Sequence, residues 1–155
     1  KGNATQTRAY DSVTEVTPRN YVNVDLSLGA KTLTSVTGGA NNAYSVTPSF
    51  GYKGILGAAD KLVVYYMTGS SPSQGPYAAA LSFTKAELEA ATVTPKTLTI
   101  FKATSAYNSA YVQAWLEFAD GTKENVSSIY GDGVTSDSSY QGPGDEWVNC
   151  KLLDY

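Results

Sequence analysis

Apolar and polar residues alternate along most of this chain, which is the pattern of β-strands that bury one face. Residues 22–28 alternate without interruption and place Val22, Val24, Leu26 and Leu28 on one face. The alternation in residues 97–101 and 147–153 is similar. These segments predict strands that each have one face in a core and one face outside it.

The longest alternating segment covers residues 110–118. One face, which we expect to point inward, carries Ala110, Val112, Ala114, Leu116 and Phe118. The other face carries Tyr111, Gln113, Trp115 and Glu117. Aromatic rings beside amide and carboxylate groups can stack on sugars or anchor a protein interface. The opposite interpretation is that a loop, the helix or a second sheet covers Tyr111 and Trp115.

Residues 62–67 are apolar on both faces and therefore predict a central strand. Weaker candidate strands are residues 10–17, 32–37, 43–50, 77–83 and 123–130. Short strands separated by glycine- and proline-rich turns indicate an all-β fold, an antiparallel β-sandwich of immunoglobulin-like or jelly-roll-like type. We expect one domain over residues 1–155. Its predicted core contains Val24, Leu26, Val64, Ile100, Val112, Ala114 and Leu116.

Two local signals add detail to this sandwich. The sequence Thr84-Lys85-Ala86-Glu87 fits a capping box, which predicts one short helix near residues 84–91 that connects the sheets. Asp120-Gly121 marks a hairpin. A three-residue loop with Gly121 in the left-handed conformation places Glu117 opposite Lys123, and we prefer it because a two-residue loop would pair two glutamates.

The segment around this hairpin resembles a known family. Tyr111 to Phe118, Asp120-Gly121-Thr122-Lys123 and Ser127-Ser128 resemble the last hairpin of fibronectin type III and related immunoglobulin-like modules. The resemblance covers about twenty residues near 110–130. It implies a scaffold for binding and assembly, and it implies no catalytic residue.

The composition excludes several kinds of chemistry. The chain has no histidine and only one cysteine, Cys150. Histidine is the commonest general acid–base residue near neutral pH and a usual zinc ligand, so its absence argues against such enzymes. One thiol cannot close an internal disulfide, and we expect Cys150 to be buried in the core, with an intermolecular disulfide as the alternative. We therefore expect neither an enzyme nor a cofactor.

One loop segment also suggests a calcium site. The segment 131–146 carries Asp132, Asp137 and Asp145 among glycine and serine residues. Oxygen-rich loops of this kind can bind calcium, but the spacing does not match an EF-hand loop. The alternative is a solvated loop held by local turns of the aspartate side chains.

Charge and composition also limit the partners. The net charge is −3, and the 11 basic residues form no cluster, which argues against a nucleic-acid partner. The longest apolar run, residues 62–67, is too short to span a membrane. Only 16% of residues are charged and 12 are tyrosine. Surfaces rich in hydroxyls, amides and phenols suggest an extracellular, cell-surface or virion location.

These observations lead to two main hypotheses. The first is a non-enzymatic structural protein, such as a subunit of a filament, a pilus-like fibre or a virion surface, that forms homo-oligomers through its sheet edges. Residues 1–17, with Tyr10, would be an extended N-terminal arm. The alternative is a carbohydrate-binding module that uses Tyr111, Gln113, Trp115 and Glu117. A small hydrolase that uses carboxylates is a third and weaker option.

Overall fold

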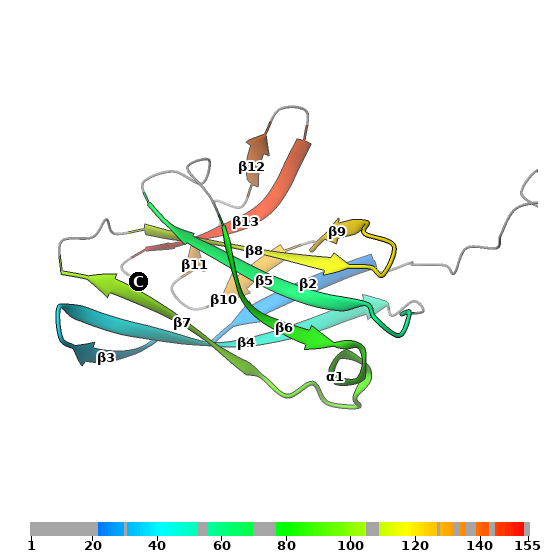
Figure 1. Cartoon of the computed structure of the whole chain (residues 1–155), viewed down its shortest axis with the longest axis horizontal. Coiled ribbons are helices and arrows are strands. Elements are labelled where there is room, and N and C mark those ends of the chain that lie inside the picture. The colour runs from blue at the N-terminus through cyan, green and yellow to red at the C-terminus, as the bar shows by residue number, and fades with distance from the viewer. Residues whose placement is uncertain are drawn as a thin grey trace, which may run out of the picture.

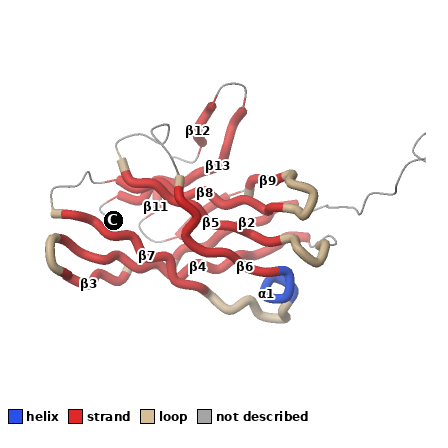
Figure 2. The backbone as a smooth tube through the Cα atoms, viewed as in Figure 1, coloured by secondary structure: helices blue, strands red, loops and turns tan. Residues whose placement is uncertain are grey.

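The computed structural model describes nine segments of the chain: residues 22–29, 31–52, 56–69, 77–104, 109–126, 128–131, 134–135, 139–142 and 145–153. For strand residues 22–24, 51–52, 109, 128 and 134–153 it describes the backbone alone. Within these limits the protein is an all-β fold with two sheets and one short helix (Figures 1 and 2). The predicted strand 10–17, and with it the proposed N-terminal arm, lies outside the described residues.

The first sheet is built around one long central strand. Its strands are β2 (Val22–Leu28), β3 (Thr32–Val36), β4 (Gly39–Tyr52), β7 (Lys96–Ala103) and β10 (Ser128–Gly131). β2 and β3 pair in succession with one edge of β4, and β7 pairs with its other edge. β10 runs parallel to β2, whereas the other pairs in this sheet are antiparallel.

The second sheet contains the predicted central strand and the long alternating strand. Its strands are β5 (Lys61–Thr68), β6 (Ala78–Thr84), β8 (Ser109–Glu117), β9 (Lys123–Asn125), β11 (Val134–Thr135), β12 (Ser139–Gly142) and β13 (Asp145–Leu153). β5 pairs with β6 on one side and β8 on the other, as its apolar faces predict. β8 in turn lies between β5 and β13.

The core lies between the two sheets, which makes the fold a β-sandwich (Figure 1). Six of the seven predicted core residues are buried there: Leu26, Val64, Ile100, Val112, Ala114 and Leu116 are each at most 1% exposed. The side chain of the seventh, Val24, is not described. Period-two alternation thus identified the inward faces of these strands correctly, because successive side chains along a strand point to opposite faces of the sheet.

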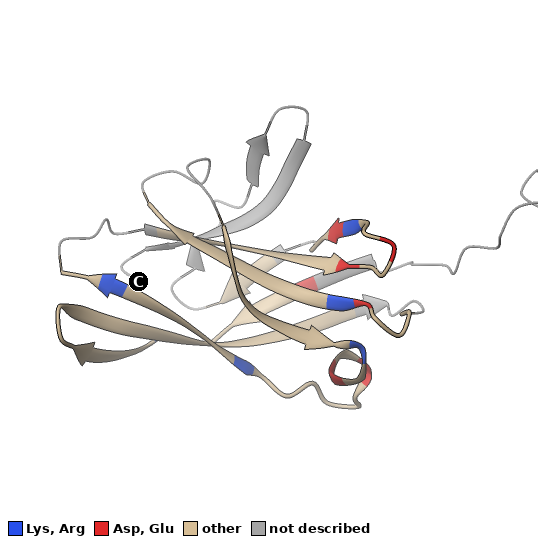
Figure 3. Ribbon diagram, viewed as in Figure 1, with Lys and Arg blue, Asp and Glu red and all other residues tan. Residues whose placement is uncertain are grey.

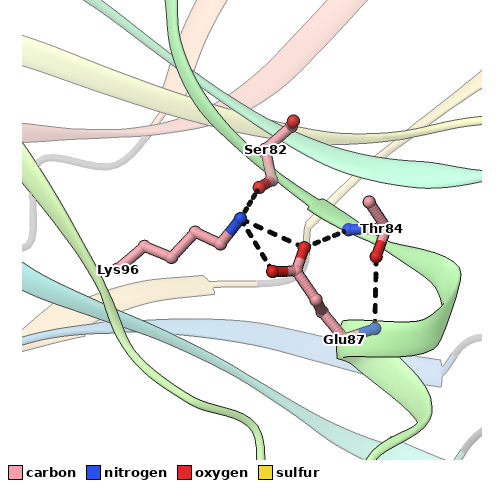
Figure 4. A network of polar contacts seen from close by, with 4 residues as sticks. All are labelled: Ser82, Thr84, Glu87 and Lys96. Carbon is pink, nitrogen blue, oxygen red and sulfur yellow. Dashed lines mark hydrogen bonds and ion pairs between the residues drawn. The ribbon is translucent and has the colours of Figure 1, made fainter.

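The predicted helix is α1 (Lys85–Glu89), and it connects β6 of the second sheet to β7 of the first. The capping box is present: Glu87 N donates to Thr84 Oγ1 at 3.3 Å, and Thr84 N donates to Glu87 Oε1 at 2.8 Å (Figure 4). Lys96, at the start of β7, donates to Glu87 Oε1 at 3.0 Å and to the Ser82 carbonyl oxygen at 2.7 Å. The ammonium of Lys96 therefore links α1 to β6 and to its own strand, β7. Although the helix is short, it contributes the fully buried Leu88 to the core.

The hairpin after β8 has the predicted three-residue loop. Glu117 pairs with Lys123, and Gly121 adopts a φ of 91°, in the left-handed region. Phe118 N donates to the Thr122 carbonyl oxygen at 2.9 Å and closes the loop. Lys123 is thereby brought to the same face of the sheet as Glu117.

The prediction of a single strand over residues 123–130 was wrong. This segment forms β9 in the second sheet and β10 in the first. Val126 and Ile129, only three residues apart, are both buried. On one continuous strand they would point to opposite faces, so the chain crosses between the sheets and both side chains reach the shared core.

Candidate functional site

The register of β8 against its neighbours determines which side chains gather on the outer face of the second sheet. Gln113 pairs with Tyr65 of β5, and Trp115 pairs with Val63 of β5 and with Asn125 of β9. Directly paired residues project to the same side of a sheet. The outer face therefore combines polar and aromatic groups from strands that are far apart in the sequence.

An open pocket with a volume of about 340 Å³ lies on this face. Its described lining residues are Tyr65 of β5, Tyr77 just before β6, Gln113 and Trp115 of β8, and Lys123 of β9. Pockets with mostly aromatic walls and a few polar groups are the usual form of small-ligand sites. The lining residues that the structure describes supply three aromatic rings, one amide and one ammonium group.

The face predicted from the sequence for recognition is only partly available. Tyr111 is 3% exposed and does not line the pocket, so its ring is covered as the alternative interpretation proposed. Gln113 is also buried, at 4% exposed, but it does line the pocket. Trp115 and Glu117 are half-buried. The pocket thus contains the middle of the predicted face.

One hydrogen bond orients the amide of Gln113. The indole Nε1 of Trp115 donates to Gln113 Oε1 at 3.2 Å. Because the indole nitrogen is only a donor, this contact identifies the oxygen end of the amide. The other end, Gln113 Nε2, is buried and has no hydrogen-bond partner among the residues that the structure describes. A buried amide without a partner is costly, and such groups often mark a binding site.

The charged groups beside the pocket balance one another. The hydroxyl of Tyr65 donates to Glu117 Oε2, and Lys123 Nζ lies 3.6 Å from the same oxygen. Lys123 Nζ also lies over the ring of Tyr65, 5.6 Å from its centre. Desolvation by burial and, next, the hydrogen bond to Glu117 raise the pKa of Tyr65 from 10.0 to about 12. Tyr65 is therefore protonated at neutral pH, and among the described residues the charges of Glu117 and Lys123 offset each other.

Sequence reasoning missed three pocket residues. Lys123 had a usable signal, because its pairing with Glu117 was predicted and places it on this face. Tyr65 lies in a strand that is apolar on both faces, where alternation does not distinguish inside from outside. Tyr77 follows a glycine-, serine- and proline-rich stretch, and no pattern within that segment relates it to β8.

The side chains of the remaining predicted site residues lie outside the described part of the structure. Tyr10 and the calcium candidates Asp132 and Asp137 lie outside the described residues, and Asp145 and Cys150 are described by their backbone alone. Cys150 pairs in register with Val112. Within the described segments, no group of three or more Cys, Asp or Glu residues could hold a metal ion. The calcium site and the buried thiol stay predictions.

The described segments contain no helix long and apolar enough to cross a membrane. Comparisons with protein-family models, with curated proteins and with solved structures found no match to this chain. Its function is therefore inferred from the chemistry of its own surfaces.

Proposed function

We propose that this chain is a non-enzymatic carbohydrate-binding module whose ligand occupies the pocket beside Trp115. The observation that carries this proposal is the gathering of Tyr65, Tyr77 and Trp115 around the amide of Gln113 in one open pocket. Sugar rings have apolar C–H faces and polar hydroxyl edges. Aromatic faces with hydrogen-bonding groups beside them complement both features.

The charge of the site supports a neutral ligand. Glu117 and Lys123 form an ion pair, and Glu117 also accepts the hydrogen bond of Tyr65. A strongly charged ligand would leave one of these groups without its partner.

The chemistry of the pocket supports binding rather than hydrolysis. Glycosidases place two carboxyl groups on opposite sides of the bond that they cleave. The described residues that line this pocket include no carboxylate, and Glu117 next to it is committed to Tyr65 and Lys123. We therefore propose a binding role without catalysis.

A glycan array probed with the full chain tests this proposal. Replacing Trp115 by alanine removes one aromatic wall, and loss of such a central ring typically costs about 2 kcal/mol, or roughly 30-fold in affinity. Phe101→Ala is the matched control, because Phe101 is 48% exposed on β7 of the other sheet. Absence of binding to every glycan, or an equal loss in the Phe101 variant, would contradict the proposal.

Self-assembly through a sheet edge is the second candidate, and strand β3 favours it. All five residues of β3 are exposed, including Leu33 at 56% and Val36 at 37%. Among the described strands, β3 pairs only with β4. Natural edge strands often carry charges that prevent pairing with other chains, and β3 carries none, whereas β7 carries Lys96 and Lys102 (Figure 3).

A second copy of the chain could extend the first sheet at this edge as an added strand. Thr34→Lys places a charge in the middle of β3 and should shift the protein toward monomers in sedimentation experiments. Ser45→Lys adds the same charge at an exposed position of the interior strand β4 and should leave the oligomeric state unchanged. A full chain that is monomeric at high concentration would refute this second candidate.

We also propose that this domain works outside the cell, on a cell surface or on a virion. The charged fraction of 16% and the 12 tyrosines support an extracellular, cell-surface or virion location. The kinship with immunoglobulin-like modules is likewise a proposal, supported by the predicted hairpin loop after β8.

A further inference from the structure

The amide of Gln113 determines more about the ligand than the aromatic walls do. Its oxygen is engaged by the indole of Trp115, at 3.2 Å. Turning the amide over would place its NH₂ group against the indole N–H, donor against donor. The amide is therefore held in one orientation, and its end without a partner among the described residues is the buried Nε2 donor.

Burial makes this free donor selective. Gln113 is 4% exposed, and Nε2 has no partner in the described part of the chain. A ligand that supplies a hydrogen-bond acceptor removes the cost of the unpaired amide, and a ligand without one leaves that cost in place. Sites built around such a group discriminate strongly against ligands that fail to satisfy it.

Two further polar groups of the pocket, those of Lys123 and Tyr65, bear on the choice of ligand. The ammonium of Lys123 is only a donor. The hydroxyl proton of Tyr65 is donated to Glu117. Gln113 and Lys123 thus offer donors, whereas the oxygen of Tyr65 keeps only its capacity to accept. A ligand that carries a good acceptor satisfies the donors.

Charge distinguishes between the possible acceptors. A ligand carboxylate could pair with Lys123, but Lys123 lies 3.6 Å from Glu117, so the new carboxylate would approach an existing one. Like charges at this range are unfavourable. A carbonyl oxygen accepts hydrogen bonds without carrying a charge, so an amide carbonyl suits this pocket better than a carboxylate.

We propose that the pocket selects sugars that carry an acetamido group. The acetamido carbonyl accepts the hydrogen bond of Gln113 Nε2, and the acetamido methyl and plane pack against the rings of Trp115 and Tyr65. This inference rests on the carbohydrate-binding function proposed above and specifies the ligand of that same site. A pocket of about 340 Å³ lies within the usual size range of small-ligand sites.

Matched sugar pairs test this selectivity. Titration of the full chain with N-acetylglucosamine and glucose, and with N-acetylgalactosamine and galactose, followed by NMR or calorimetry, compares ligands that differ at the acetamido position. We expect the acetamido sugar of at least one pair to bind about tenfold or more tightly than its partner. Glucuronic acid is included as the charged competitor and should bind more weakly than N-acetylglucosamine.

Two variants assign the preference to Gln113. Gln113→Met keeps the length of the side chain and removes the donor, so the acetamido preference should fall to near parity. Gln113→Glu keeps an acceptor for the indole of Trp115 and removes the Nε2 donor, so it should abolish the preference as well. A thermal unfolding curve of each variant shows whether the protein is folded, and one folded variant is sufficient to test the role of Gln113. Trp115→Ala should instead weaken the binding of both sugars in a pair.

The outcomes separate this inference from the proposed function. Equal binding of both members of each pair, or tighter binding of glucuronic acid, together with a loss in Trp115→Ala, would overturn the acetamido preference and leave carbohydrate binding intact. An acetamido preference that persists in folded Gln113→Met would also overturn it. Binding of no sugar at all would overturn both proposals.

Discussion

Asp60 connects two loops at one end of the second sheet, and its replacement tests how this end is stabilised. The residue lies just before β5 and is 3% exposed. Its Oδ2 accepts a hydrogen bond from Gly57 N at 2.6 Å, and its Oδ1 accepts one from Ala119 N at 3.0 Å. The second bond reaches the hairpin that presents Lys123 to the pocket.

The expected cost follows from these contacts. Hydrogen bonds to a charged acceptor contribute about 1.5–3 kcal/mol each. Ala119 is exposed, so water can replace part of its lost contact in Asp60→Ala, whereas the contact to Gly57 lies within the loop. We therefore expect the free energy of unfolding to fall by about 2–4 kcal/mol, a large share of the 5–15 kcal/mol typical of a domain.

Asp120 offers a matched control in the same hairpin. Its Oδ1 also accepts two hydrogen bonds, from Thr122 N at 3.0 Å and from Thr122 Oγ1 at 2.7 Å, but Asp120 is exposed. Asp120→Ala should therefore cost less than about 1 kcal/mol. The loss of stability in Asp60→Asn should lie between the losses in Asp60→Ala and Asp120→Ala. The amide of asparagine keeps one acceptor but turns a donor toward the other N–H group.

Urea unfolding followed by tryptophan fluorescence measures these differences, with the free energies obtained by linear extrapolation. A loss in Asp60→Ala no larger than that in Asp120→Ala would refute the reasoning. Such a result would mean that the buried carboxylate contributes nothing beyond an exposed one.

Three further predictions concern the helix, the pocket and the sheet. Thr84→Ala removes the cap of α1 and should cost about 1 kcal/mol by urea unfolding, whereas Thr84→Ser should restore most of it; equal losses in both would contradict the capping role. Absorbance titration should find Tyr65 ionising near pH 12, so its contribution to stability is complete below about pH 10 and is lost as the pH rises toward 12. Glu117→Gln should lower this pKa toward 10.0, and an unchanged titration curve would show that Glu117 has no part in it. Gly39→Ala would place a Cβ 2.1 Å from the Lys102 carbonyl oxygen and should cost about 1–3 kcal/mol, whereas a stability equal to wild type would show that β4 and β7 can separate there.

The inward faces of individual strands were predictable because alternation is a local property. Side chains two residues apart on a strand share a face whatever that strand pairs with, so Val112 and Leu116 could be assigned to the core from the sequence. The capping box of α1 and the loop around Gly121 were predictable for the same reason, since each depends on residues close together in the chain.

Exposure on the outer face was not predictable from alternation. Tyr111 and Trp115 lie on the same face of β8, yet Tyr111 is 3% exposed and Trp115 is half-buried. What covers a side chain on an outer face depends on elements that are remote in the sequence. Alternation therefore identified the strand that carries the site but not which of its residues are accessible.

The sequence by itself determined the all-β class, the inward faces of the main strands, the short capped helix and the absence of histidine chemistry. Only the tertiary structure decided that Tyr65 lies opposite Gln113, that Lys123 reaches the same pocket, and that Gln113 Nε2 is buried without a partner in the described residues. The reason is physical: a strand's own pattern specifies two faces, whereas pairing and register are selected by the burial of all the strands together.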